Sequence, residues 1–125
     1  MASVGLTEAQ AIEKYGEKLV RTAIKYGSDR SLCEGYDSKN IVYKVVFHAK
    51  TQIILGSTIM SPTAGETISE IGVAMKTKMK YPNIATVMHS YPSHAFGLQV
   101  MASEQYYANL AKYKGLLSIL KGVGL

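Results

Sequence analysis

The chain has 125 residues, of which 47% are apolar and 18% charged, and its formal net charge is +5. This composition is typical of one globular domain and argues against a disordered or fibrous chain. No run of about 18 apolar residues exists, which argues against a transmembrane helix. The start of the chain lacks the pattern of a signal peptide. Cys33 is the only cysteine, so an internal disulfide, a CxxC pair and a zinc site of cysteines are all excluded.

The lysines are scattered along the sequence and form no basic block interleaved with aromatic residues. A solvated surface is therefore the preferred interpretation of the net charge, and we expect neither a nucleic-acid nor a membrane partner. A binder of nucleic acid or of an anionic surface remains an alternative that rests on the charge alone. Cys33 is interpreted as a buried or incidental thiol rather than a nucleophile.

The first predicted element is a helix over residues 6–16. Thr7 is its expected N-cap, Gln10 completes a capping box, and Gly16 suits the position after the last helical residue. Residues 17–26 alternate in polarity and predict a half-buried strand. Its expected inner face consists of Val20, Thr22, Ile24 and Tyr26. Residues 27–40 are rich in Gly, Ser, Asp and Asn and predict a loop.

The next two elements are β-branched runs over residues 41–49 and 51–60, joined by a short polar turn. They predict an antiparallel hairpin. Gly56 lies inside the second run, which indicates either a bulge or a close approach by another stretch of backbone.

Residues 61–79 predict the clearest helix of the chain. Thr63 and Glu66 suit a capping box, and Pro62 stands at the start, where its missing N–H costs little. Residues at helical spacing define a buried face that we interpret as core rather than as a cofactor site: Ile68, Ile71, Met75 and Met79.

The last part of the chain also reads as helical. Residues 81–89 predict a helical turn or two that ends before Pro92, and residues 93–113 predict a helix. One side of that helix carries Leu98, Met101, Ala102, Tyr106 and Leu110. Residues 115–125 predict an apolar tail docked against another surface. Strands followed by helices predict an α+β domain, with helices packed on one face of an antiparallel sheet.

Four motifs in this order resemble one known family. They are "ASVGLTEAQA", "SDRSLCEG", "YKVVFHAKTQIILGSTIMSPTAGETISEIGVAM" and "IATVMHSYPSHAF". Together they are similar to the C-terminal dimerisation domain of the FAD-dependent pyridine nucleotide-disulfide oxidoreductases, which include dihydrolipoamide dehydrogenase, glutathione reductase and mercuric reductase. The resemblance runs from Ala2 to about Leu110.

The resemblance implies a homodimer and a larger flavoprotein. In the family, separate domains bind FAD and NAD(P), and a redox cysteine pair lies beside the flavin. None of these is present here, so residues 1–125 are interpreted as a single dimerisation domain that binds no cofactor alone. The parent enzyme would pass electrons from NAD(P)H through FAD to an acceptor. The residues that select the acceptor, the nicotinamide cofactor and the compartment lie outside this chain.

The family also implies a role for the loop around Pro92. There, a histidine before the proline serves the partner subunit's cysteines and flavin, and a glutamate orients it. These positions fall on Tyr91 and Phe96, so the usual acid–base pair is missing, since tyrosine is a poor base near neutral pH. Tyr91 and, more weakly, His89 are the catalytic candidates, and His94 is a lesser one. Both histidines are otherwise expected at a surface or interface with a polar partner.

A contact to the partner's flavin by Tyr91, Pro92 and Ser93 remains, because proline preserves the shape of the loop. Mercuric reductases are similar in placing tyrosine before this proline, but their C-terminal cysteine pair is absent here. Tyrosine is also a poor ligand for a soft metal, so no metal site is predicted. The alternative function is a stand-alone interaction module that kept the fold and lost the enzyme. The apolar segments "FGLQVMA" and "GLLSIL", with Tyr106 and Tyr107, are the expected dimer surface.

Overall fold

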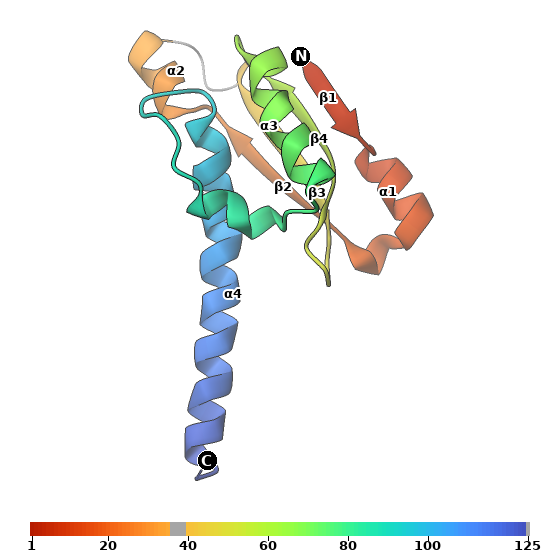
Figure 1. Ribbon diagram of the computed structural model, residues 1–125, viewed down its shortest axis with the longest axis vertical. Coiled ribbons are helices and arrows are strands. Elements are labelled where there is room, and N and C mark those ends of the chain that lie inside the picture. Colours follow the sequence, from red (N-terminus) through yellow and green to blue (C-terminus); the bar gives the residue numbers. More distant parts are fainter. Residues whose placement is uncertain (36–39, 125) are drawn as a thin grey trace.

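A four-stranded antiparallel sheet in the order β1-β4-β3-β2 organises the fold (Figure 1). The computed structural model describes residues 1–35 and 40–124. The strands are β1 (Ala2–Gly5), β2 (Val20–Tyr26), β3 (Val42–His48) and β4 (Ile54–Met60). The α-helices are α1 (Glu8–Tyr15), α2 (Asp29–Glu34), α3 (Ala64–Lys76) and α4 (Phe96–Gly122), and two 3-10 helices are η1 (Glu17–Leu19) and η3 (Tyr81–Thr86). The predicted α+β class and the hairpin of β3 and β4 are confirmed.

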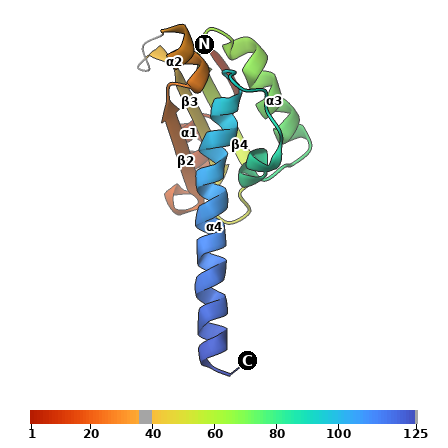
Figure 2. The same ribbon diagram turned by 90° about the vertical axis from the view of Figure 1, so that its left-hand side faces the viewer.

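The main core lies between the sheet and α3, η3 and α4, and it contains Tyr43, Val45, Phe47, Ile59, Ile71, Tyr81, Ile84, Leu98 and Met101. A smaller cluster of Ala11, Val20 and Val46 lies beneath α1. Val45 and Val46 are neighbours on a strand and therefore point to opposite faces of the sheet. The sheet thus carries α3 and α4 on one face and α1 on the other. Figure 2 shows α4 crossing in front of the strands.

Two local predictions are confirmed in detail. Thr7 caps α1 through a reciprocal capping box with Gln10. Gly56 shows both of its predicted features, because the β3–β4 register shifts beside it and the backbone of Leu6 crosses it. A Cβ at Gly56 would lie 1.9 Å from the carbonyl oxygen of Leu6, so only glycine fits this crossing.

The predicted inner face of the strand over residues 17–26 is wrong in its second half. Residues 17–19 form η1, and the strand begins at Val20. Ile24 and Tyr26 are 50% and 63% exposed, although the alternation placed them inside. The physical reason is that β2 is an edge strand of the sheet and the cluster beneath α1 includes only its first residue, Val20. Ala23, from the opposite face, packs against the main core instead.

The predicted loop over residues 27–40 contains α2. Ser28 caps this short helix and exchanges hydrogen bonds with Ser31, and Gly35 ends it in the left-handed region. Cys33 is exposed on α2, so it is not a buried thiol. Residues 36–39 of the predicted loop lie outside the described residues.

The predicted capping box at the start of α3 does not form. Thr63 is the N-cap, but its ψ of 28° is not extended, and its hydroxyl makes no bond to the first turn. That hydroxyl instead lies 3.3 Å from the hydroxyl of Thr67. The remaining helix prediction holds, since Ile71 is fully buried and Ile68, Met75 and Met79 pack against the core.

The apolar tail predicted to dock is the continuation of α4. Every described residue from position 110 to 124 is exposed, and Figure 1 shows α4 projecting as a rod beyond the sheet. Leu98 and Met101, expected at a dimer surface, lie in the domain's own core. No helix in the described part of the chain combines the length and apolarity needed to span a membrane.

Candidate functional site

The loop between η3 and α4 carries the predicted site residues. Its tip is Tyr91, which is 67% exposed, followed by an exposed Pro92 across a cis peptide bond. The rings of Tyr91 and Phe96 form an edge-to-face pair, with centroids 5.1 Å apart. The positions that hold a base and a carboxylate in the family's pattern are therefore adjacent here, but they form an aromatic contact that cannot transfer a proton.

Ser93 shapes the loop from within. Its hydroxyl donates to the carbonyl of Ser90 at 2.6 Å and accepts the backbone N–H of Phe96 at 3.1 Å. The second contact satisfies one of the free N–H groups at the start of α4, which is the work of a helix cap. The hydroxyl of Ser93 is consequently engaged inside the loop.

His89 points inward rather than sharing the exposure of Tyr91. Its side chain is only 6% exposed, and Nε2 contacts the carboxylate of Glu70 on α3. Nδ1 lies 2.7 Å from the carbonyl oxygen of Val87 and 3.0 Å from Oε1 of Gln99. Both ring nitrogens therefore have polar partners inside the domain, Nε2 on α3 and Nδ1 on the loop and α4. His89 therefore connects the loop to α3, and we call this set of contacts the His89 clamp.

His94 is a second inward clamp. It is buried, contrary to the expected surface position, and Nδ1 lies 3.1 Å from the hydroxyl of Ser28. Nε2 lies 3.6 Å from a carboxylate oxygen of Glu34, and the carbonyl of His94 accepts the hydroxyl of Tyr43 at 2.7 Å. Burial raises the pKa of Tyr43, and a hydrogen bond with Ser28 opposes part of that rise. The polar partner predicted for His94 is therefore present, in the interior.

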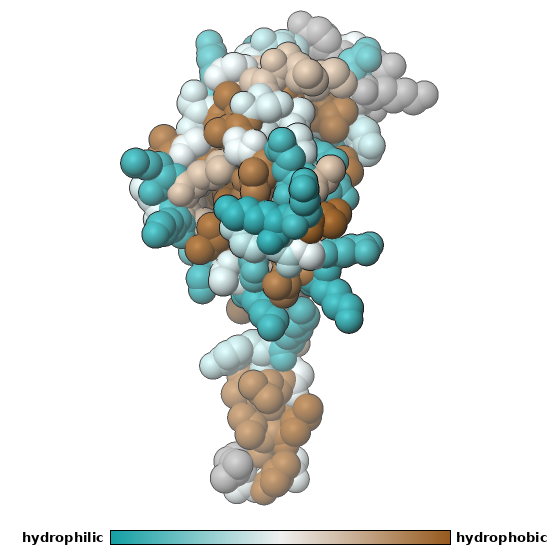
Figure 3. Space-filling model, turned by 90° about the vertical axis from the view of Figure 1, so that its right-hand side faces the viewer, coloured by the Kyte–Doolittle hydropathy of each residue, from teal (hydrophilic) through white to brown (hydrophobic). Residues whose placement is uncertain are grey.

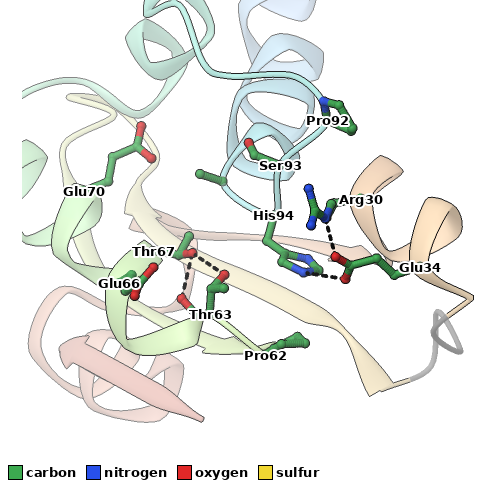
Figure 4. A pocket seen from close by; sticks show the side chains of 11 residues that line it. Arg30, Glu34, Pro62, Thr63, Glu66, Thr67, Glu70, Pro92, Ser93 and His94 are labelled. Carbon is green, nitrogen blue, oxygen red and sulfur yellow. Dashed lines mark hydrogen bonds and ion pairs between the residues drawn. The ribbon is translucent and has the colours of Figure 1, made fainter.

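A groove of about 490 Å³ opens between the loop, α2 and α3 (Figure 4). Its walls carry Glu66 and Glu70 from α3 and the ion pair of Arg30 with Glu34 from α2. His94 points into the space between these helices. Within the described residues, no group of three His, Cys, Asp or Glu side chains is placed to hold a metal ion.

Sequence reasoning did not single out Glu34, Glu70 or Ser28. Glu70 is 19 residues from His89, and Ser28 is 66 residues from His94. No local pattern connects such distant positions, because only the packing of α2 and α3 beside the loop brings them together. The one available signal was the charge of Glu70 among the otherwise uncharged residues 67–75.

Comparison with known proteins settles the family. The dimerisation domain of the pyridine nucleotide-disulphide oxidoreductases matches residues 1–102. The chain belongs to this family. Mitochondrial dihydrolipoyl dehydrogenase of Pisum sativum is 31% identical over 106 residues, which is 85% of this chain and 21% of that protein. Dihydrolipoyl dehydrogenase of Halobacterium salinarum is 29% identical over 93 residues, covering 74% of this chain and 19% of that protein.

Solved structures share the fold. LpdA from Mycobacterium tuberculosis superposes with a TM-score of 0.71 at 20% identity, over 82% of this chain and 22% of that one. The HOCl-induced flavoprotein disulfide reductase RclA from Escherichia coli gives 0.72 at 22% identity, over 81% of this chain and 23% of that one. The dimerisation-domain chain thus spans about a fifth of the length of the relatives it matches.

Proposed function

We propose that this domain forms the homodimer interface of an FAD- and NAD(P)-dependent oxidoreductase. We further propose that its loop over residues 90–96 covers the flavin of the partner subunit. The family supports the dimer, and the named relatives support a flavoprotein parent. The observation that carries the loop's role is its shape. Tyr91 and Pro92 are exposed at the tip, and the buried side chains of His89 and His94 hold its two sides.

The groups that the loop exposes suit covering a flavin ring and keeping water from it, rather than binding the cofactor. FAD, when bound by the parent, supplies the transfer of electrons between NAD(P)H and the acceptor. Because the hydroxyl of Ser93 is used inside the loop, the outward groups are the ring and hydroxyl of Tyr91, the ring of Pro92 and main-chain atoms. Such groups exclude water and position a planar ring, but they do not hold a phosphate.

The acid–base relay of the disulfide reductases is not part of this proposal. Tyr91 and Phe96 occupy its two positions, and His89 points at acceptors on both sides. The domain's contribution to the parent is then shape and exclusion of water, with proton transfer supplied from elsewhere in the enzyme.

An apolar surface beside the loop suits a second copy of the domain. A groove of about 320 Å³ between α3 and η3 is lined mainly by Val73, Ala74, Met79, Ile84 and Val87. Val73 is 64% exposed and Met88, next to Val87, is 95% exposed. A two-fold partner would bury these side chains in a self-complementary patch, and burial of apolar area is what stabilises such interfaces.

The test of the interface is the oligomeric state of the chain by light scattering across a range of concentrations. We expect a dimer that Val73→Lys and Met88→Lys each convert to a monomer, because a charge would be desolvated in the interface. Ile24→Lys, on the exposed side of β2, is the matched control and should leave the dimer intact. A strict monomer at high concentration would overturn the interface.

The test of the flavin contact needs the full-length protein that contains this chain. We expect Tyr91→Ala to change the absorbance and solvent reactivity of the bound flavin, and Tyr91→Phe to leave both unchanged because the ring is retained. An Ala variant with an unaltered flavin would contradict the proposed contact. A full-length protein that binds no flavin would instead favour the interaction module, a reading that the loss of the histidine–glutamate pair supports.

A further inference from the structure

The outer half of α4 lies beyond the residues that the family domain matches. The family match ends at residue 102, whereas α4 continues to Gly122. The reciprocal amide pair of Gln52 and Asn109 is the last side-chain hydrogen bond between the sheet hairpin and α4 among the described residues. Beyond it, the helix runs free of the domain (Figure 1). This outer segment comprises residues 110–122.

The outer segment is strongly two-sided. Residues three, four and seven apart share a helix face. That spacing groups one broad apolar face, which is exposed throughout and consists of Leu110, Tyr113, Leu116, Leu117, Leu120 and, just past the helix end, Val123. The opposite side carries small residues: Ala111, Gly115, Ser118 and Gly122. Ile119, which is 65% exposed, lies beside Lys112 at the border between the two sides. Figure 3 shows the apolar side chains gathered on this projecting rod.

Lysines border the apolar face on both of its edges. Lys114 and Lys121 lie one turn after Leu110 and Leu117 on one edge, and Lys112 lies one turn before Leu116 on the other. The sequence contains no aspartate or glutamate after Glu104. The outer segment therefore has a net charge of +3, from three lysines and no acidic residue. The whole chain has a net charge of +5, from 14 basic and 9 acidic residues.

We propose that the outer segment of α4 lies on an anionic phospholipid bilayer, with its apolar face in the headgroup–acyl boundary. Lysines on both borders of an apolar face can extend to the phosphates while their stems stay among apolar groups. Charge decides against a second copy as the occupant, because pairing two such segments brings two sets of lysines together without an acidic partner. Gly115 and Gly122 also favour contact with an external surface. Glycine weakens a helix that nothing supports, and a bilayer surface would stabilise it.

The test is flotation of the 125-residue chain with vesicles of phosphatidylcholine alone or with about a third phosphatidylserine. We expect binding to the anionic vesicles, weakened by salt, and little binding to the neutral ones. Replacing Lys112, Lys114 and Lys121 by glutamine should lower the affinity about a hundredfold, since each cation near such a surface contributes about fivefold. Replacing Leu116 and Leu117 by serine should abolish binding.

A matched control removes the same charge from the globular part, by replacing the exposed Lys18, Lys76 and Lys78 with glutamine. This control should bind like the original chain. The outer-segment variants should keep the unfolding temperature of the domain, because the replaced side chains are exposed. Equal binding to neutral and anionic vesicles, or equal loss in the control, would overturn the proposal. So would a dimer by light scattering that the Leu116 and Leu117 variant breaks, because the face would then belong to a second copy.

Discussion

The imidazole of His89 contacts the carboxylate of Glu70 and thereby fastens the loop before α4 to the middle of α3. Five residues on, His94 fastens the other side of the same loop through Ser28 and Glu34 near α2. The exposed Tyr91 lies between these two anchors. A loop held at both sides presents its tip in one position, and such preorganisation reduces the conformational cost of any contact made there.

Breaking the His89 clamp should loosen the loop and destabilise the domain. His89→Ala removes the imidazole from its contacts with the Glu70 carboxylate and the Val87 carbonyl, which costs about 1–3 kcal/mol. Hydrogen exchange of the backbone should rise over residues 87–95, and chemical denaturation gives the loss of unfolding free energy. Glu70→Gln should cost less, because the amide oxygen still accepts from the imidazole.

The control for this clamp is Glu66→Gln, one turn earlier on α3 and lining the same groove. It should cost only about 0.3–1 kcal/mol, the usual value of an acidic side chain in a first helical turn. A double variant of His89 and Glu70 should be less destabilised than the sum of its parts, since the two residues share one interaction. Strict additivity with unchanged exchange would contradict the clamp.

Gly56 should tolerate no larger side chain. An alanine Cβ would meet the Leu6 carbonyl oxygen at 1.9 Å, and Leu6 directly follows β1 and is bonded to Leu55 of β4, so this backbone cannot move aside cheaply. We expect Gly56→Ala to lower the unfolding free energy by about 3 kcal/mol. Gly72→Ala is the matched control, because its Cβ meets nothing within 4 Å inside α3, and it should stabilise by about 0.5–1 kcal/mol. Similar unfolding midpoints for the two variants would be the contrary result.

The sequence predicted correctly those features whose signals lie within a few consecutive residues. The Thr7 and Gln10 box, the hairpin and the glycine at position 56 each depend on a few consecutive residues, and the structure confirms them. The helix α2 escaped prediction because its cap uses serine at both positions, whereas the usual signature has an acidic or amide side chain at the second. At Thr63 that signature was present, but the backbone turned the hydroxyl toward Thr67.

The candidate site was predictable in outline but not in its contacts. Pro92 and its neighbours marked the loop, and the family pattern placed the lost acid–base pair on Tyr91 and Phe96. The burial of both histidines followed instead from where α2 and α3 pack, which no short motif encodes. The outer half of α4 shows the converse case: its apolar residues suggested docking, yet no described element of the domain lies opposite them.

The exposed ion pair of Glu8 and Lys44 should make the stability of the domain depend on pH in the acidic range. Lys44 lies 2.8 Å away, and its hydrogen bond and charge lower the pKa of Glu8 below the ordinary value of 4.5. A lowered pKa in the folded state means that the pair stabilises above the unfolded pKa, and that this contribution is lost as the pH falls through the folded one. Lys44→Met should return the Glu8 pKa to its ordinary range in a side-chain NMR titration, whereas Lys76→Met should not. An unmoved Glu8 pKa would show that the pair is absent in solution.

The hydroxyl of Tyr43 should matter both for stability and for its dependence on alkaline pH. Tyr43→Phe removes one of two donors to the buried carbonyl of His94, which keeps the backbone N–H of Gly97, and we expect a loss of about 1 kcal/mol near neutral pH. Burial raises the Tyr43 pKa above its ordinary value of 10.0, so the folded state holds this proton more tightly than the unfolded state. Stability from this difference is complete below pH 10.0 and falls as the pH rises toward the folded pKa. The midpoint temperature of unfolding should therefore decline less steeply above pH 10.0 in Tyr43→Phe than in the original chain. Tyr26→Phe, at an exposed position of β2, should change neither the midpoint nor the slope, and an alkaline slope that Tyr43→Phe leaves intact would assign the decline to other groups.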